Sequence, residues 1–98
     1  MSRYRVEFLS AAARDLRKLA KEIAKFQLTA IRNAVMELAE DPKPQQAKAV
    51  RGHSDLLRIR TGDYRIVYRV ADEVPTVLVV AGGDRGDVYD RLLRRWSE

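Results

Sequence analysis

The sequence contains no cysteine, which excludes a disulfide framework and a thiolate metal site. It contains a single histidine, His53, and one such ligand cannot form a metal site, so we expect neither a metal nor another cofactor. No run approaches the roughly 18 apolar residues of a membrane-spanning helix. The N-terminus also lacks the layout of a secretory signal peptide. These absences, with a length of 98 residues, predict a single cytoplasmic domain over residues 1–98.

Lysine is missing from the second half of the chain, where every Lys/Arg position from Arg51 onward is arginine. The net charge is +5, a balance that favours nucleic acid, an acidic protein or a membrane surface as partner. A guanidinium matches two phosphate oxygens at once, which an ammonium cannot do. Bias toward arginine codons would also enrich arginine, but it should not spare the first half. We therefore favour a phosphate-binding role for the second half.

The first part of the chain predicts one strand and two helices. Alternation of apolar residues over residues 3–8 indicates a half-buried strand. Ser10 is a suitable N-cap for the alanine-rich helix that follows. Two apolar stripes at helical spacing are out of phase, so we predict two antiparallel helices with a break near residues 20–25. Prolines within residues 41–44 end the second helix. The stripes are Ala12, Leu16, Leu19 and Ile23, then Leu28, Ile31, Val35 and Leu38.

The second half predicts a meander of strands. We expect His53 to lie exposed in a loop, Gly62 to take a positive φ in a tight turn, and Gly82-Gly83 to end a buried strand. No nucleophile elbow, phosphate-cradling glycine loop or dinucleotide fingerprint interrupts this pattern. The expected strands span residues 47–50, 56–61, 64–70 and 76–81, and a short C-terminal helix spans residues 87–96.

The predicted fold class is therefore α+β, with the two helices packed on one face of an antiparallel sheet. Alternation then leaves Arg58, Arg60 and Arg65 together on the open face. Like charges that face each other destabilise a sheet unless an anion lies between them. The alternative is that these arginines only form a solvated sheet face. The apolar residues expected beneath the helices are Leu57, Ile59, Ile66 and Tyr68.

Three segments carry a family resemblance. The sequence Gly62-Asp63-Tyr64-Arg65 lies within residues 59–68, an apolar strand follows at 77–80, and residues 84–89 read Asp-Arg-Gly-Asp-Val-Tyr. This pattern resembles the RelE/ParE superfamily of toxin–antitoxin toxins. Further similarity lies at residues 4–8, 13–19, 38–42 and 50–52, so the resemblance covers nearly the whole chain.

The resemblance implies a type II toxin that a cognate antitoxin neutralises. RelE-like members enter the ribosome and inhibit translation as mRNA endoribonucleases, in which a ribose 2′-hydroxyl attacks the adjacent phosphate. Arg58 and Arg60 match the basic strand pair of that branch. Arg65 and Arg85 match its phosphate-stabilising arginines, and Tyr89 matches its C-terminal tyrosine. Preplaced guanidinium donors suit the negative charge of a phosphorane, so we expect these three residues to be catalytic.

Other residues near this pattern have accessory roles or depart from it. Arg51 is a further RNA-binding candidate, and Asp84 is a candidate accessory residue that orients Arg85. Many members carry lysines in place of Arg58 and Arg60, and a histidine or lysine in place of Asp84. Because arginine is a poor general base, two alternatives remain. One is a ParE-like toxin that poisons DNA gyrase, and the other binds RNA or antitoxin without cleavage.

Overall fold

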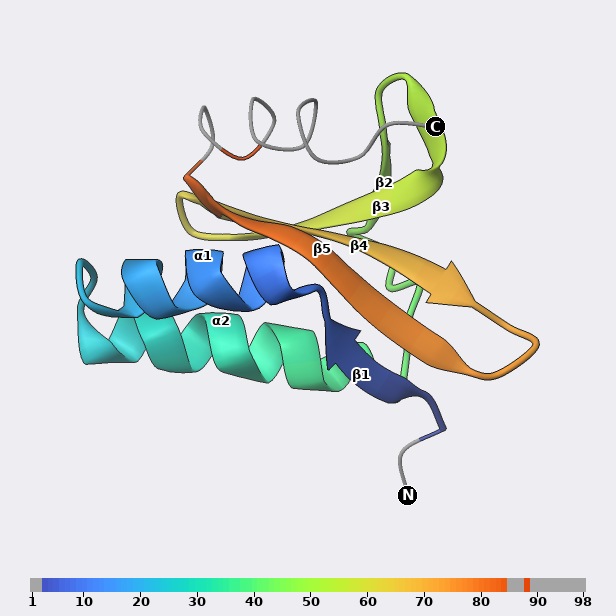
Figure 1. Ribbon diagram of the computed structural model, residues 1–98, viewed down its shortest axis with the longest axis horizontal. Helices are drawn as coiled ribbons and strands as arrows, with labels where there is room; N and C mark the ends of the chain where they lie inside the picture. Colours follow the sequence, from blue (N-terminus) through green and yellow to red (C-terminus); the bar gives the residue numbers. More distant parts are fainter. Residues whose placement is uncertain (1–2, 85–87, 89–98) are drawn as a thin grey trace.

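The computed structural model describes residues 3–84 and residue 88, and Figure 1 shows its arrangement. A strand and two helices come first, and an antiparallel meander follows, so the predicted α+β class is confirmed. The predicted C-terminal helix lies outside the described residues, apart from Val88. The elements are β1 (Arg5–Phe8), α1 (Ser10–Ala20), α2 (Lys25–Glu37), β2 (Lys48–Val50), β3 (His53–Thr61), β4 (Tyr64–Ala71) and β5 (Thr76–Asp84).

The sheet is mixed, which corrects the prediction of a wholly antiparallel sheet. Its strand order is β1-β5-β4-β3-β2. Strand β1 runs parallel to β5, with Arg5 opposite Thr76 and Phe8 opposite Val79, and all other pairs are antiparallel. The alternating pattern of β1 predicts a strand but carries no information about its partner. Both helices and three further strands separate β1 from β5, and a connection of this length permits parallel pairing.

Helices α1 and α2 lie on the same face of the sheet and run in opposite directions (Figure 1). The break between them, from Ala20 to Lys25, is where the change in stripe phase predicts it. Their apolar stripes meet the strands in one buried core. That core contains Ala12, Leu19, Ile31, Val35 and Leu38 from the helical part, and Ile59, Ile66, Tyr68, Val77 and Val79 from the strands.

A second, smaller core covers part of the opposite face of the sheet. The prediction that this whole face is open is therefore wrong. Leu56, Val67 and Val80 are completely buried there, and Val88 packs against them from beyond β5. Alternation places a residue on a face, but it does not show what later covers that face. Arg58, Arg60 and Arg65 consequently share their face with an apolar cluster.

The start of α1 differs from the prediction as well. Ser10 is the first residue of the helix, and Leu9 takes the N-cap position with extended backbone angles and no side-chain cap. The backbone N–H of Leu9 still donates to the carbonyl of Val79, at 3.0 Å. The chain therefore turns directly from β1 into α1, with no residue free to cap the helix through its side chain.

The two glycines near the end of β5 lie inside the strand, which continues to Asp84. This corrects the prediction that Gly82-Gly83 ends it. A Cβ at residue 82 would lie 3.0 Å from Leu16 Cδ2 and 3.2 Å from Ile66 Cδ1. Glycine is present because α1 packs closely on the strand at this point.

The segment after α2 is held against the sheet by a buried tyrosine. The Tyr68 hydroxyl donates to the carbonyl of Pro42 at 2.7 Å. Burial raises the pKa of Tyr68 to about 12, with a further contribution from the negative charge of Asp41. Neutral Tyr68 thus satisfies a carbonyl at the end of the helical layer.

Candidate functional site

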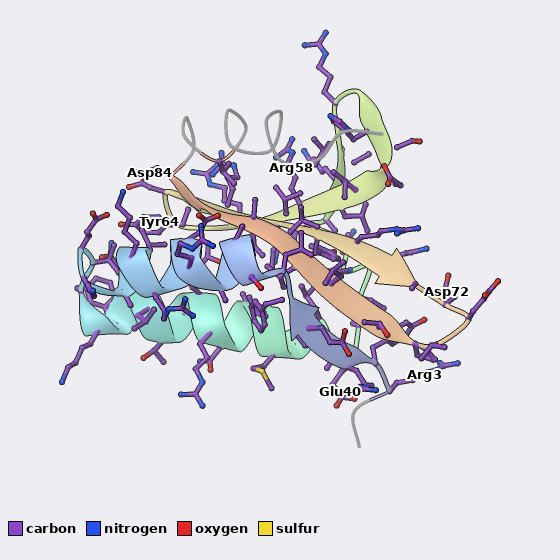
Figure 2. All side chains as sticks on the ribbon, viewed as in Figure 1. Arg3, Glu40, Arg58, Tyr64, Asp72 and Asp84 are labelled. Atoms are coloured by element: carbon purple, nitrogen blue, oxygen red, sulfur yellow. The ribbon has the colours of Figure 1, made fainter. Side chains whose placement is uncertain are left out.

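The β3–β4 hairpin brings two arginines together on the face opposite the helices. Arg60 and Arg65 are direct cross-strand partners across the turn that contains Gly62. Directly opposite residues of an antiparallel pair have Cβ atoms about 4.5–5.5 Å apart. Arg58 lies two residues earlier on β3, opposite Val67, and Figure 2 shows it on the side of the sheet away from both helices. The structure therefore gathers the three arginines on one face.

Arg65 is largely withdrawn from water. Only 8% of its surface is exposed, and its Nη1 atom is buried without a hydrogen-bond partner among the described residues. An unsatisfied buried charged donor is unfavourable by roughly 1–3 kcal/mol or more. Poor screening also strengthens the attraction of this guanidinium for an anion. Arg65 is thus held in a state that a phosphate would stabilise.

Arg60 is exposed, but its guanidinium is oriented by the turn. Its Nε donates to the carbonyl of Gly62 at 2.9 Å. Gly62 has φ of 62°, the left-handed conformation predicted for this tight turn, which glycine adopts without steric penalty. The turn therefore fixes one edge of the Arg60 guanidinium beside Arg65.

Two carboxylates lie at the same end of the sheet. Asp63 is in the turn, and Asp84 ends β5 opposite Tyr64, which precedes Arg65. Figure 2 shows Tyr64 and Asp84 at this end. In the described part of the chain, neither carboxylate forms an ion pair with Arg60 or Arg65. The arginine pair is therefore not neutralised by these neighbours.

Of the remaining predicted site residues, only Arg51 lies among those that the structure describes. Arg51 is exposed in the turn between β2 and β3, on the segment that leads into the sheet from its edge. Arg85 and Tyr89 lie outside the described residues, so their roles stay predictions. Val88 is buried on the arginine-bearing face and marks where the chain continues from β5.

His53 does not lie exposed in a loop as predicted. It is the first residue of β3, half-buried, and pairs with Val50 at an irregularity of the β2–β3 register. Its Nδ1 atom is buried without a hydrogen-bond partner in the described part of the protein. Across that part, no group of three or more potential metal-binding side chains is found. No helix there is long and apolar enough to cross a membrane.

A hollow beside the hairpin turn has no counterpart in the sequence predictions. It is lined by Phe26, Gln27 and Ala30 of α2 and by Thr61, Gly62 and Tyr64 of the hairpin. Phe26 is 76% exposed. The signal in the sequence was the position of Phe26 off the apolar stripe of its helix.

The chain matches a known family over most of its length. The model for the ParE toxin of the type II toxin–antitoxin system parDE matches residues 6–89. Toxin RelG of Mycobacterium tuberculosis is 32% identical over 88 residues, which cover 90% of this chain and 98% of RelG. The mRNA interferase toxin RelE of Escherichia coli is 29% identical over 96 residues, which cover 94% of this chain and 96% of RelE.

Solved structures share the fold. A mutant of Escherichia coli toxin RelE in the free state aligns with a TM-score of 0.72 and 27% identity, covering 99% of this chain and 100% of that chain. A chain of the toxin–antitoxin complex RelBE2 from Mycobacterium tuberculosis aligns with a TM-score of 0.68 and 30% identity, covering 84% of this chain and 98% of that chain. This chain therefore belongs to the ParE toxin family of type II toxin–antitoxin systems and is a RelE-like member of the RelE/ParE superfamily.

Proposed function

We propose that this toxin is a ribosome-dependent mRNA endoribonuclease that inhibits translation in the cytoplasm. The observation that carries the proposal is the Arg60–Arg65 pair, in which Arg65 is 8% exposed and its Nη1 has no partner within the described chain. Two facing cations, one of them poorly solvated, form a site for a phosphate. The similarity to the mRNA interferase RelE supports RNA as the source of that phosphate.

The proposed reaction transfers the phosphate within the RNA strand. The 2′-oxygen forms a bond to phosphorus while the bond from phosphorus to the 5′-oxygen breaks. The products are a 2′,3′-cyclic phosphate and a free 5′-hydroxyl, and the proton lost from the 2′-hydroxyl is balanced by one gained at the 5′-oxygen. Arg65, with Arg85, stabilises the charge that gathers on the phosphorane oxygens. Arg51, Arg58 and Arg60 bind flanking phosphates.

Proton transfer needs a group other than arginine, which does not deprotonate at ordinary pH. We assign this role, or stacking on a base, to Tyr89, which matches the C-terminal tyrosine of the RelE-like branch. Asp84 is assigned to orient Arg85. Tyr89→Phe keeps the ring and removes the hydroxyl, so it should lose cleavage as Tyr89→Ala does if Tyr89 transfers the proton. Full cleavage by Tyr89→Phe alone would restrict Tyr89 to stacking. Loss of cleavage by Asp84→Asn, with binding intact, would instead identify Asp84 as the base.

The decisive experiment is translation of a reporter mRNA with purified toxin, followed by mapping of RNA ends by primer extension. We expect cuts within the translated region that require ribosomes and disappear in Arg65→Ala. An intact message in the presence of active ribosomes would reject nuclease activity.

The second candidate is poisoning of DNA gyrase, and the match to the ParE toxin model favours it. In this case the arginine face would bind gyrase or DNA rather than mRNA. A gyrase supercoiling assay with the same toxin preparation separates the two functions. Inhibition of supercoiling without mRNA cleavage would select the gyrase function, and loss of both would leave a toxin that binds RNA or antitoxin only.

We also propose a cognate antitoxin as partner. The similar RelBE2 chain comes from a toxin–antitoxin complex, and a net charge of +5 suits an acidic, partly disordered segment that folds on binding. Co-expression with the adjacent reading frame should rescue growth and yield a stable complex. If that reading frame changes neither growth nor recovery of the toxin, it does not encode the partner.

A further inference from the structure

The hollow between α2 and the β3–β4 turn lies next to the arginine pair. Its walls come from two layers of the molecule: Phe26, Gln27 and Ala30 from the start of α2, and residues 61, 62 and 64 from the hairpin. Apart from the amide of Gln27 and the hydroxyls of Thr61 and Tyr64, these side chains are apolar. The hollow is therefore mainly apolar, with a few hydrogen-bonding groups.

Phe26 is exposed to a degree that the fold does not require. The core side of α2 is formed by Ile31 and Val35, which are 2% and 4% exposed, whereas Phe26 is 76% exposed. Full burial of a phenyl ring is favourable by about 1.5–3 kcal/mol, so much of that stabilisation is unused in the isolated toxin. A single exposed aromatic residue is unremarkable, but this one borders a hollow that a planar group can enter.

One turn connects the hollow to the phosphate site. Gly62 lines the hollow, and its carbonyl accepts the hydrogen bond from Arg60 Nε at 2.9 Å. Tyr64 lines the hollow from the helix side of β4, and the next residue, Arg65, projects to the other side opposite Arg60. A ligand in which a sugar joins an anionic group to a flat apolar group would therefore reach both surfaces around the same turn.

Resting on the proposed function, we infer that this hollow binds an unpaired nucleobase of the RNA whose phosphate contacts Arg60 and Arg65. The base stacks on the Phe26 ring, because every base offers a π-face to an aromatic side chain. The Oε1 of Gln27 accepts from the backbone N–H of Ala24 at 3.0 Å, so its amide N–H groups and the Thr61 hydroxyl serve the polar edge of the base. An apolar peptide side chain would use the ring but not the neighbouring cations, so nucleic acid fits both features better.

The test compares wild type with Phe26→Ala on intact and on abasic RNA. The proteins are wild type and Phe26→Ala, with Met36→Ala as a matched control, because Met36 is 56% exposed at the far end of the same helix. The RNAs are a short single-stranded 2′-O-methyl oligomer, which cannot be cut through its 2′-position, and versions with one abasic nucleotide at each position in turn. Binding is measured by fluorescence anisotropy over a series of salt concentrations.

We expect Phe26→Ala to bind the intact oligomer about tenfold more weakly than wild type, because the substitution removes the stacking of one base. The salt dependence of binding should not change, because the substitution removes no charge. When the base is missing at one particular position, the affinity of wild type for the RNA should fall by a similar factor, and the affinity of Phe26→Ala should not change. Phe26→Trp should retain wild-type affinity, and Met36→Ala should bind like wild type.

If every abasic RNA reduced the binding affinity of wild type and of Phe26→Ala by the same factor, the inference would be overturned. So would a Phe26→Ala variant that binds RNA normally but no longer forms a complex with the antitoxin, since the hollow would then belong to a protein partner. The proposed function is tested separately by Arg65→Ala, which should reduce the salt slope by about 0.7. A normal slope in that variant would contradict the phosphate site itself.

Discussion

The two faces of the sheet are built from the same strands and differ in what their side chains do. On the helix side, Ile59, Ile66 and Tyr68 are at most 2% exposed and every one packs in the main core. On the other side, the intervening residues include an apolar cluster around Val67 and the arginine pair, where a buried guanidinium nitrogen has no partner among the described residues. The helix side is therefore filled by apolar packing, whereas the other side combines apolar packing with charged guanidinium groups.

We therefore expect that the stability of this protein and its binding can be changed independently. Side chains alternate between the faces of a strand, so adjacent positions of β4 belong to different tasks. Substitutions at the helix side should reduce the free energy of unfolding, whereas substitutions at the arginine pair should reduce binding or cleavage with little effect on folding.

The largest effect is expected from Tyr68→Ala. It removes a completely buried ring and the hydrogen bond to Pro42, and should lower the free energy of unfolding by about 3–5 kcal/mol. Urea denaturation followed by circular dichroism measures the loss. Arg69→Ala, the exposed neighbour on the opposite face, is the control and should change stability by less than about 0.5 kcal/mol. Similar losses in both variants would erase the distinction between the faces.

Arg65→Ala should have the largest effect on activity. Loss of one preplaced donor to a developing oxyanion typically lowers a rate by about 100- to 1000-fold. Single-turnover cleavage of mRNA on programmed ribosomes measures the rate. The free energy of unfolding should stay the same or rise, because an unsatisfied buried charge is removed. Arg69→Ala, four residues along the same strand, should cleave normally. A strongly destabilised Arg65→Ala with normal cleavage would make this arginine structural.

Gly82→Ala tests the closest approach between a helix and the sheet. The added Cβ would lie 3.0 Å from Leu16 Cδ2, so the side chain of Leu16 must shift. We expect a loss of about 1–2 kcal/mol in the free energy of unfolding, since the contacted atoms end flexible side chains. Thermal unfolding measures the change. Recovery of stability in the double variant Gly82→Ala, Leu16→Ala would confirm the clash, and an unaffected single variant would show that α1 has room at this position.

The smallest effect is expected from Tyr68→Phe, which removes only the hydroxyl. At neutral pH its free energy of unfolding should be about 1 kcal/mol lower than that of wild type, which is the net contribution of one hydrogen bond. The pKa of Tyr68 is raised from 10 in the unfolded chain to about 12 in the fold, so its contribution is complete below pH 10. Between pH 10 and 12 the unfolded chain ionises first, and stability falls by up to about 1.4 kcal/mol per pH unit. Tyr68→Phe should lack this fall.

The alkaline comparison needs one control, because the fold raises the pKa of a second tyrosine as well. The hydrogen bond from the Tyr4 hydroxyl to Asp72, at 2.8 Å, raises the pKa of Tyr4. Urea titrations between pH 9 and 12 are therefore best made in a Tyr4→Phe background. Parallel pH profiles for Tyr68 and Tyr68→Phe in that background would contradict the raised pKa.

The sequence predicts the local geometry of the site well. A short turn at Gly62 fixes the register of β3 against β4, and strict alternation then places Arg58, Arg60 and Arg65 on one face. The burial of Arg65 was not predictable, because alternation gives the face of a side chain and not its exposure. The sequence does not identify Phe26 as a candidate, because an exposed aromatic residue suggests a binding site only when a hollow is seen beside it.

The incorrect predictions about the fold have a similar cause. Residue type predicts that Gly82-Gly83 ends the strand, yet here Gly82 makes room for the side chain of Leu16. Ser10 was interpreted as a cap from its residue type, although the hydrogen bond between Leu9 and Val79 extends the β1 pairing to the start of the helix. In each case a contact with a distant residue outweighed a local preference.

The parallel pairing of β1 with β5 joins the two ends of the described sequence, since Arg5 lies opposite Thr76. Contacts between residues so far apart in sequence form slowly during folding, because a long loop must close first. As the chain is synthesised, β1 leaves the ribosome long before its partner strand exists. The apolar faces of the N-terminal strand and helix therefore stay exposed to solvent until residues 76–84 have left the ribosome. Fast synthesis and early capture of this segment should both reduce aggregation of the nascent toxin.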